Sequence, residues 1–213
     1  IGLPAGLQGM LFSISNLLIQ SSVNSFGKIV IAGNSASANV EGFAFVAMNA
    51  FHQGAVAFMG QNKGAGRYDR LGKVLSTSLV YVFITGLIFA VIYNVFSYEL
   101  IGLYTNSEDV VKAGVTRLVI IATAYFLAGM MDVVVGAIRG LGYSLVPMIV
   151  SVFGICIFRV FWIFCIFSQE QYHTIGSIYY SYPISWILTL SVQLMCYFWI
   201  KVKIIDKKRK LSR

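Results

Sequence analysis

The sequence predicts an all-α membrane protein in which six transmembrane helices form one bundle. Of its 213 residues, 58% are hydrophobic and only 11% are charged, whereas a soluble domain carries about 25% charged residues. A soluble fold of this composition would leave large apolar patches in contact with water. The mean hydropathy of +0.78 agrees with a chain that is surrounded by lipid. Six apolar stretches also reach the length of about 20 residues that a membrane-crossing helix needs.

The six predicted spans follow one another with short polar connections between them. Each span is expected to be helical, because a backbone in lipid must satisfy its hydrogen bonds within its own segment. The spans cover approximately residues 5–26, 36–59, 74–98, 114–138, 145–167 and 176–200. Residues 1–200 are therefore expected to form the bundle, and residues 201–213 a basic cytoplasmic tail.

The cations are distributed unevenly between the two sides of this arrangement. Twelve of the sixteen Lys and Arg residues lie in segments 60–73 and 139–144 and in the tail from Lys201. The opposite segments hold Lys28, Lys112 and Arg117. Since Lys and Arg concentrate in cytoplasmic loops, both ends are expected on the cytoplasmic side of the cell membrane. The "KKRK" run of the tail is expected to meet anionic lipid headgroups, so the net charge of +8 requires no nucleic-acid partner.

Residues 60–73, "GQNKGAGRYDRLGK", are rich in glycine and cations, as phosphate-binding loops are. A P-loop reads G-x-x-x-x-G-K-[ST] after a buried strand. Here no Ser or Thr follows the lysines, and a predicted membrane helix precedes the segment. The segment is therefore predicted to end a helix and form a tight turn at Gly64 and Gly66, with no nucleotide bound.

The three cysteines lie in apolar runs without C-x-x-C spacing, at positions Cys156, Cys165 and Cys196. Small hydrophobic filler is therefore expected rather than a metal site or a disulfide frame. No cofactor is expected.

Ionisable residues within a span are costly and are candidates for function. Asp132 shares a helix face with Tyr125 and Arg139. Its carboxylate could exchange protons, bind Na⁺ together with further oxygen ligands, or serve as a structural group bonded to a neighbouring helix. Glu41, near the start of the second span, is the other candidate for cation coupling, unless it lies in water.

Two further ionisable residues lie within spans. His52 shares a face with Glu41 and could relay protons or only pack against its neighbours. Arg159 is the only cation placed deep in a span. The sequence favours a structural ion pair between Arg159 and either Glu41 or Asp132.

The first span carries a polar stripe, because Asn16, Gln20 and Asn24 follow one another at intervals of four residues. Such a stripe either binds helices together or lines a wet cavity. Asn16 and Gln20, together with His52 and Tyr125, are the candidates for a substrate pathway or cavity.

Three stretches resemble, in order, parts of one known family. "GLPAGLQGMLFSISNLLIQSSVNSFG" is similar to the seventh helix of multidrug and toxic compound extrusion (MATE) transporters. "NVEGFAFVAMNAFHQGAVAFMGQNKGAGRYDR" resembles the eighth helix with its cytoplasmic turn, and "GAIRGLGYSLVPMI" the junction of the tenth and eleventh helices. The resemblance covers nearly the whole chain and implies that it is the C-terminal six-helix half, with the first half before Ile1.

The resemblance also implies a function. MATE transporters export amphipathic, often cationic compounds by alternating access, driven by inward Na⁺ or H⁺. In members with a cation site in this half, acids on the seventh and tenth helices contribute. Asp132 would be the tenth-helix acid. The seventh-helix stretch has Asn16 and Gln20 in place of an acid, so Glu41 is a possible substitute. The expected partners are the lipid bilayer, the N-terminal half of the same transporter and small amphipathic substrates.

Two other functions are weighed against the exporter. A flippase for a lipid-linked oligosaccharide, from the wider superfamily, would need a strongly cationic cavity for pyrophosphate, and Arg159 is the only deep cation. A six-span intramembrane serine protease would need a GxSG-like motif and a partner histidine. "GNSAS" has no glycine after Ser35, and His173 lies in a loop. An exporter is favoured, and no enzymatic activity is expected.

Overall fold

The computed structural model describes the backbone of residues 2–211 and the side chains at position 4 and at positions 6–206. This part of the chain contains helices and no strand. The helices are α1 Gly2–Asn24, α2 Lys28–Gly64, η1 Tyr68–Arg70, α3 Leu71–Val95, α4 Ser97–Gly102, α5 Glu108–Thr123, α6 Tyr125–Gly140, α7 Leu145–Ser151, η2 Val152–Ile157, α8 Phe158–Trp162, η3 Ile163–Phe167, η4 Glu170–Tyr172 and α9 Ile175–Leu211. The side chains of the "KKRK" run and the whole of Arg213 lie outside the described residues.

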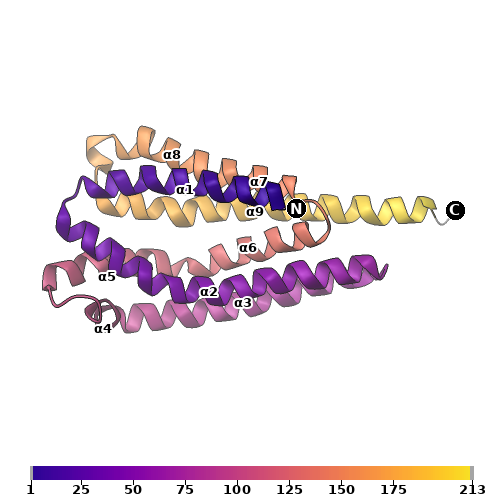
Figure 1. Cartoon of the computed structure of the whole chain (residues 1–213), viewed down its shortest axis with the longest axis horizontal. Helices are drawn as coiled ribbons and strands as arrows, with labels where there is room; N and C mark the ends of the chain where they lie inside the picture. Colours follow the sequence, from indigo (N-terminus) through magenta and orange to yellow (C-terminus); the bar gives the residue numbers. More distant parts are fainter. Residues whose placement is uncertain (1, 212–213) are drawn as a thin grey trace.

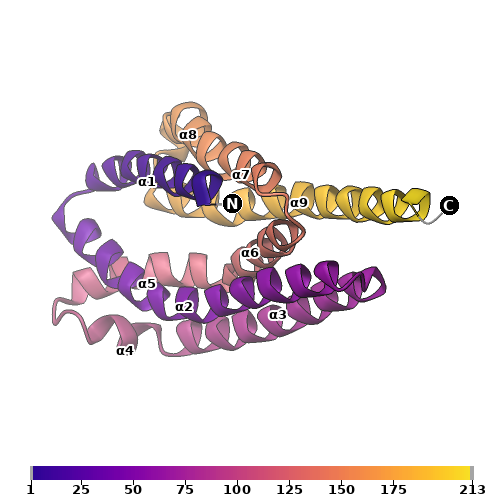
Figure 2. The same ribbon diagram turned by 45° about the vertical axis from the view of Figure 1, so that its right-hand side comes forward.

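The long helices run back and forth along one axis and form two groups (Figures 1 and 2). Helices α1, α7, α8 and α9 lie on one side, and helices α2, α3 and α5 lie on the other. Helix α6 lies between the groups and packs against α2, α3 and α9. Its central residues 133–138 are all buried.

Small residues allow α6 to approach α2 closely. A Cβ atom added at Gly140 would lie 2.5 Å from the carbonyl oxygen of Val56, and one added at Gly136 would lie 2.6 Å from that of His52. Close backbone approach at small residues is how membrane helices commonly associate. The α2–α6 contact therefore depends on the absence of side chains at these two positions.

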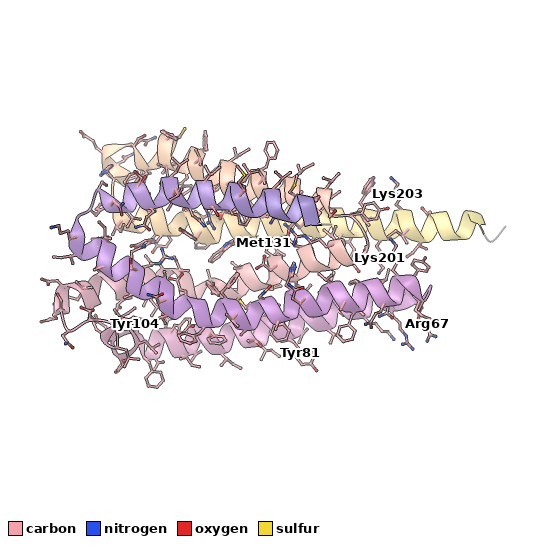
Figure 3. The ribbon with its side chains drawn as sticks, viewed as in Figure 1. Arg67, Tyr81, Tyr104, Met131, Lys201 and Lys203 are labelled. Carbon is pink, nitrogen blue, oxygen red and sulfur yellow. The ribbon has the colours of Figure 1, made fainter. Side chains whose placement is uncertain are left out.

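The basic segments gather at one end of the bundle. The connections 60–73 and 139–144 and both described ends of the chain lie toward the same end in Figure 1. Figure 3 shows Arg67, Lys201 and Lys203 in this region. Helix α9 continues past the predicted tail boundary at residue 200, so the start of the basic tail is helical. The basic segments that the sequence placed on one side thus lie toward one end of the bundle.

Length and composition alone identify three stretches of the described chain that can cross a membrane: Tyr68–Val95, Leu145–Phe167 and Ile175–Asp206. Helices α5 and α6 together meet the same test if their bent pair counts as one span. Within the described residues, α1 and α2 are not among these stretches, and both carry polar residues in their apolar sequence. These polar residues include Asn16 and Gln20 in α1 and Asn34 and Glu41 in α2.

Two helical stretches are less regular than the sequence predicted. One uninterrupted helix was expected over 114–138, but the helix begins at Glu108 and bends by 49° between Thr123 and Tyr125. No proline marks the bend, and the hydroxyl of Thr123 bonds to the carbonyl oxygen of Val119. Farther along the chain, two π-helical segments, η2 and η3, flank the short helix α8. Such wide turns often occur at functional sites.

The glycine-rich segment forms a helix end and a tight turn, as predicted. The amide of Arg67 donates to the carbonyl oxygen of Asn62 at 2.9 Å, and the amide of Gly66 donates to that of Lys63 at 3.0 Å. Gly66 has a φ of 70°, which favours glycine over other residues. Gly64 is the last residue of α2 and adopts an ordinary helical conformation.

Candidate functional site

A partly open cavity of about 240 Å³ lies between the two groups of helices. It brings together five of the seven residues that the sequence singled out: Asn16, Glu41, Tyr125, Asp132 and Arg159. Helices α1, α2, α5, α6, α8 and α9 and segment η2 all contribute to its walls. Met131, which also lines the cavity, is seen between the two groups near mid-length in Figure 3. Aromatic residues supply much of the remaining lining: Phe12, Phe45, Tyr182 and Trp186.

Asp132 lines this cavity from α6, and its carboxylate has no hydrogen-bond or ion-pair partner in the described chain. Its half-buried carboxylate makes no hydrogen bond and no ion pair with another described residue. Arg139, two turns later on the same helix, donates to the Oε1 atom of Gln8 at 2.7 Å. The alternative of a carboxylate bonded to a neighbouring helix is therefore not seen, and Asp132 remains available to a proton, a cation or a ligand.

His52 does not line the cavity. Its Nδ1 atom lies 2.7 Å from the backbone carbonyl oxygen of Asp132. Because a carbonyl oxygen only accepts hydrogen bonds, Nδ1 carries the hydrogen. This contact holds the imidazole against α6, behind the cavity wall. Of the two roles considered for His52, proton relay and packing, the contact agrees with packing.

Glu41 pairs with Arg117 of α5, and not with Arg159. The Nε and Nη2 atoms of Arg117 each donate to one oxygen of the carboxylate, both at 2.9 Å. The hydroxyl of Ser37 donates to Oε1, also at 2.9 Å. Glu41 is 7% exposed and Arg117 is 8% exposed. The predicted ion pair of Arg159 with Glu41 or Asp132 was therefore wrong, because Arg117, assigned to the outer side, points into the protein and occupies Glu41.

The ion pair extends into a polar network that divides the stripe of α1. Arg117 Nη1 donates to Oδ1 of Asn34 at 2.8 Å, and Asn34 Nδ2 donates to Oε1 of Gln20 at 3.0 Å. Gln20 Nε2 then donates to Oδ1 of Asn24 at 2.9 Å. Asn16 alone of the stripe lines the cavity. The residues of the stripe thus differ: Gln20 joins α1 to α2, Asn24 bonds to Gln20 within α1, and Asn16 faces the cavity.

Arg159 is held in the cavity wall by neutral groups of α9. It is 5% exposed, and its Nε atom donates to the hydroxyl oxygen of Ser185 at 3.0 Å. The guanidinium carbon lies 3.9 Å from the centre of the Tyr182 ring and 5.9 Å from that of the Trp186 ring. Within the described residues no carboxylate lies within salt-bridge distance of Arg159.

Sequence reasoning missed two features of this region. The first feature is the burial of Arg117. Because Arg117 lies inside the predicted span 114–138, the span boundaries already indicated that it could be buried. The second feature is a stripe on α9 whose residues recur every four positions and are at most 1% exposed: Ser181, Ser185, Thr189 and Gln193. The same spacing rule that found the stripe of α1 would have found it.

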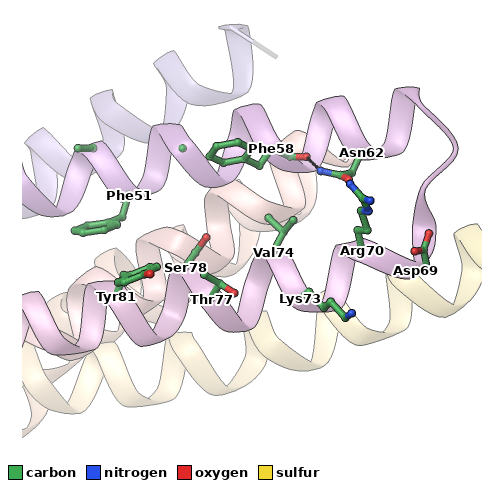
Figure 4. A pocket seen from close by; sticks show the side chains of 12 residues that line it. Phe51, Phe58, Asn62, Asp69, Arg70, Lys73, Val74, Thr77, Ser78 and Tyr81 are labelled. Carbon is green, nitrogen blue, oxygen red and sulfur yellow. Dashed lines mark hydrogen bonds between the residues drawn. The ribbon is translucent and has the colours of Figure 1, made fainter.

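A second, more open hollow of about 890 Å³ runs between α2 and α3 (Figure 4). Phe51, Phe58 and Tyr81 line its length, and Arg70 and Lys73 line its basic end. None of the glycines of the 60–73 segment lines it. The geometry therefore differs from a phosphate loop, in which backbone amides surround the phosphate.

Comparisons with known proteins agree on one family. A family model described as MatE matches residues 4–165. The probable multidrug resistance protein YoeA of Bacillus subtilis (strain 168) is 25% identical over 215 residues, which cover 100% of this chain and 45% of YoeA. The probable multidrug resistance protein YpnP of the same organism is 30% identical over 159 residues, covering 75% of this chain and 36% of YpnP.

Solved structures show the same fold. The Vibrio cholerae MATE transporter VcmN in its bent form has a TM-score of 0.81 at 20% identity, over 94% of this chain and 45% of VcmN. An outward-facing multidrug resistance MATE family transporter of the MOP superfamily has a TM-score of 0.75 at 15% identity, over 94% of this chain and 44% of the other. The chain spans less than half the length of these proteins.

The protease alternative is discarded, because members of this family are transporters and not enzymes. The resemblance that the three quoted stretches carried is confirmed. The chain belongs to the MatE family of multidrug and toxic compound extrusion transporters.

Proposed function

We propose that this chain is the C-terminal six-helix half of a cation-coupled exporter of amphipathic or cationic drugs, in which Asp132 binds the coupling ion. The observation that carries the proposal is an unpaired carboxylate in the wall of a cavity within a MatE-family helix bundle. The N-terminal half is the expected partner, since the matched relatives are about twice as long as this chain.

The proposal includes six membrane crossings with both ends in the cytoplasm. Support comes from the long helical segments of the described chain, which alternate in direction, and from the basic connections at one end (Figure 1). Helices α1 and α2 carry polar residues that contact the cavity or the network behind it, among them Asn16 and Asn34. Such residues avoid lipid in this arrangement, so low hydropathy does not prevent α1 and α2 from crossing.

The coupling ion is proposed to be H⁺ or Na⁺. A carboxylate without a partner inside a membrane protein needs a proton, a cation or a ligand to offset its charge. A proton requires only Asp132. A sodium ion, as a hard cation, requires further oxygen ligands, and Asn16 and Tyr125 line the same cavity.

Glu41 is the weaker candidate for coupling. Its charge is already offset by two hydrogen bonds from Arg117 and a third from Ser37. Binding a second cation there would require the ion pair to open. The proposal therefore assigns Glu41 to holding α2 against α5, and assigns ion binding to Asp132.

Coupling follows from a difference in affinity between two states. Ion binding at Asp132 favours one packing of the bundle, and the drug binds the other packing more tightly; this difference is all that exchange requires. The aromatic residues of the cavity suit an apolar drug body. A flippase receives less support, because the cavity offers one unpaired guanidinium beside one carboxylate, which is a poor match for pyrophosphate.

The test replaces Asp132 by Asn in the full-length transporter, which keeps the shape and removes the charge change. Ethidium is added outside everted vesicles, in which the cytoplasmic face is outward, and its accumulation in the lumen is followed under a proton or sodium gradient directed out of the lumen. We expect Asp132→Asn to express normally and to lose gradient-driven accumulation. The matched control is Asp109→Asn, at an exposed acid of α5, which should transport normally.

Two results would contradict the assignment. If Asp132→Asn exports normally while well-folded Glu41→Gln is inactive, the coupling site lies on α2. If both variants export normally, the ion binds outside the residues described here.

A further inference from the structure

The bundle contains two buried arginines that are treated differently. Arg117, 8% exposed, has the carboxylate of Glu41 and the amide oxygen of Asn34 as acceptors. Arg159, 5% exposed, has only the hydroxyl of Ser185. A buried charge without a counter-ion is costly. All three side-chain nitrogens of Arg117 therefore donate hydrogen bonds, whereas only one nitrogen of Arg159, at the cavity wall, does so.

The Nη1 and Nη2 atoms of Arg159 lack hydrogen-bond acceptors in the part of the chain that the structure describes. A guanidinium has five N–H donors, and only Nε makes a hydrogen bond with another described residue. The Nη1 and Nη2 atoms are accessible. Among the described residues, the fully buried side-chain atoms without a hydrogen-bond partner are Ser15 Oγ, Arg139 Nε and Gln193 Oε1, and they do not include the Nη atoms of Arg159. Because Arg159 lines the cavity, these two nitrogens are open to a molecule within it.

The surroundings hold this guanidinium in one place. The hydroxyl of Ser185 donates to the carbonyl oxygen of Tyr182 at 2.7 Å, which leaves its lone pairs for Arg159. The Tyr182 ring covers one face of the guanidinium at 3.9 Å. Nearby, Gly154 packs directly on Thr189, so η2 and α9 lie close together. The donors are thus positioned before any ligand arrives.

We propose that Arg159, with the rings of Tyr182 and Trp186, forms an anion-recognising subsite of the cavity for amphipathic substrates that carry a carboxylate or sulfonate on an aromatic body. This inference rests on the proposed function, because it assumes that the cavity receives the transported substrate. The two Nη atoms present the planar fork that matches a carboxylate. The two rings provide stacking surface for the aromatic body.

Among the described residues, no carboxylate is paired with Arg159. Glu41 is bound by Arg117, and Asp132 makes no ion pair with Arg159 although both line the cavity. A substrate that also carries a positive group would complement both unpaired charges at once. Arg159 thereby extends the substrate class beyond purely cationic compounds.

The test measures equilibrium binding to the purified full-length transporter in lipid nanodiscs, at one pH and salt concentration and without a gradient. The probes are 2-naphthoate and 2-naphthamide, which have similar shapes and differ in charge. Because hydrogen bonds to charged groups are strong, we expect the wild type to bind naphthoate about ten- to a hundredfold more tightly. Arg159→Gln should remove this preference and leave the affinity for naphthamide unchanged.

The control removes a cation that does not line the cavity, Lys112 of α5, in the variant Lys112→Gln. This variant should keep the preference for naphthoate. A wild type without preference, or a preference that survives in Arg159→Gln, would overturn the proposal. If Arg159 served only to pack α8 against α9, Arg159→Gln would lower the melting temperature and leave the preference intact.

A measurement on the wild type covers the case in which Arg159→Gln does not fold. Phenylglyoxal modifies arginine side chains, and mass spectrometry reads the extent of modification at Arg159. Naphthoate should slow this modification and naphthamide should not; equal protection by both probes would count against the subsite. Since neither assay uses an ion gradient, loss of the subsite and loss of ion coupling at Asp132 are distinguished.

Discussion

The buried ion pair of Glu41 and Arg117 leads to a quantitative prediction about stability. Breaking such a pair by removing one partner costs about 3–5 kcal/mol, because the other charge is left in the protein without a counter-ion. The two single variants should differ. In Arg117→Met the carboxylate of Glu41 can take up a proton, whereas in Glu41→Gln the guanidinium of Arg117 cannot lose one. Glu41→Gln is therefore expected to be the more damaging change.

The expected size follows from the geometry of the pair. Glu41→Gln replaces the two carboxylate oxygens that accept at 2.9 Å by one neutral amide oxygen, and leaves the charge of Arg117 with neutral acceptors and the faces of two tyrosine rings at 5.6 Å. At about 2–4 °C per kcal/mol for a chain of this size, a loss of about 3–5 kcal/mol lowers the melting temperature by about 6–20 °C. The double variant Arg117→Met/Glu41→Leu should lie close to the wild type, since it leaves neither charge unpaired.

The assay is thermal unfolding of the purified transporter in detergent, followed by tryptophan fluorescence for the wild type, both single variants and the double variant. The double-variant cycle isolates the interaction between the two residues. The reasoning would be refuted if the single variants had the melting temperature of the wild type. It would also be refuted if the melting temperature of the double variant fell by the sum of the two single decreases.

Three further predictions concern the backbone and the topology. Gly66→Val should destabilise the protein by about 1–2 kcal/mol because its φ of 70° disfavours a β-branched residue, whereas Gly64→Val should have a smaller effect; thermal melts of the two compare them directly. Gly140→Leu should separate α6 from α2, since a Cβ there would lie 2.5 Å from a carbonyl oxygen, and should abolish a monodisperse peak in size-exclusion chromatography. Cysteines introduced at Ala65 and Ile205 should react with an impermeant maleimide from the same face of the membrane; labelling from opposite faces would refute the proposed topology.

The sequence predicted the parts of the fold that depend on neighbours along the chain. Hydropathy located the helical stretches, and the glycines marked the turn at Gly66. Helical spacing placed Tyr125 and Asp132 on one face of their helix and Asn16 in the polar stripe of the first span, and these three residues line the cavity. These inferences succeeded because a helix repeats its faces regularly, so the spacing of residues defines which of them share a face.

The missed features depend on contacts between distant segments. Spacing along α2 shows which face carries Glu41, but not that Arg117, 76 positions later, meets it. The bend after Thr123 and the π-helical turns beside Arg159 occur in ordinary apolar sequence, without proline at either place. Such irregularities arise from how neighbouring helices fit together, so the sequence of one segment does not reveal them.

The central claim, that Asp132 exchanges a cation for the drug, is tested most directly by ion release on drug binding. Ethidium is added to the purified full-length transporter in weakly buffered solution, while a pH dye and a sodium electrode follow the two candidate ions. Because binding at linked sites is reciprocal, the wild type is expected to release about one H⁺ or one Na⁺ per protein. Asp132→Asn should bind ethidium and release neither ion. Release of the same ion in the same amount by Asp132→Asn would contradict the account.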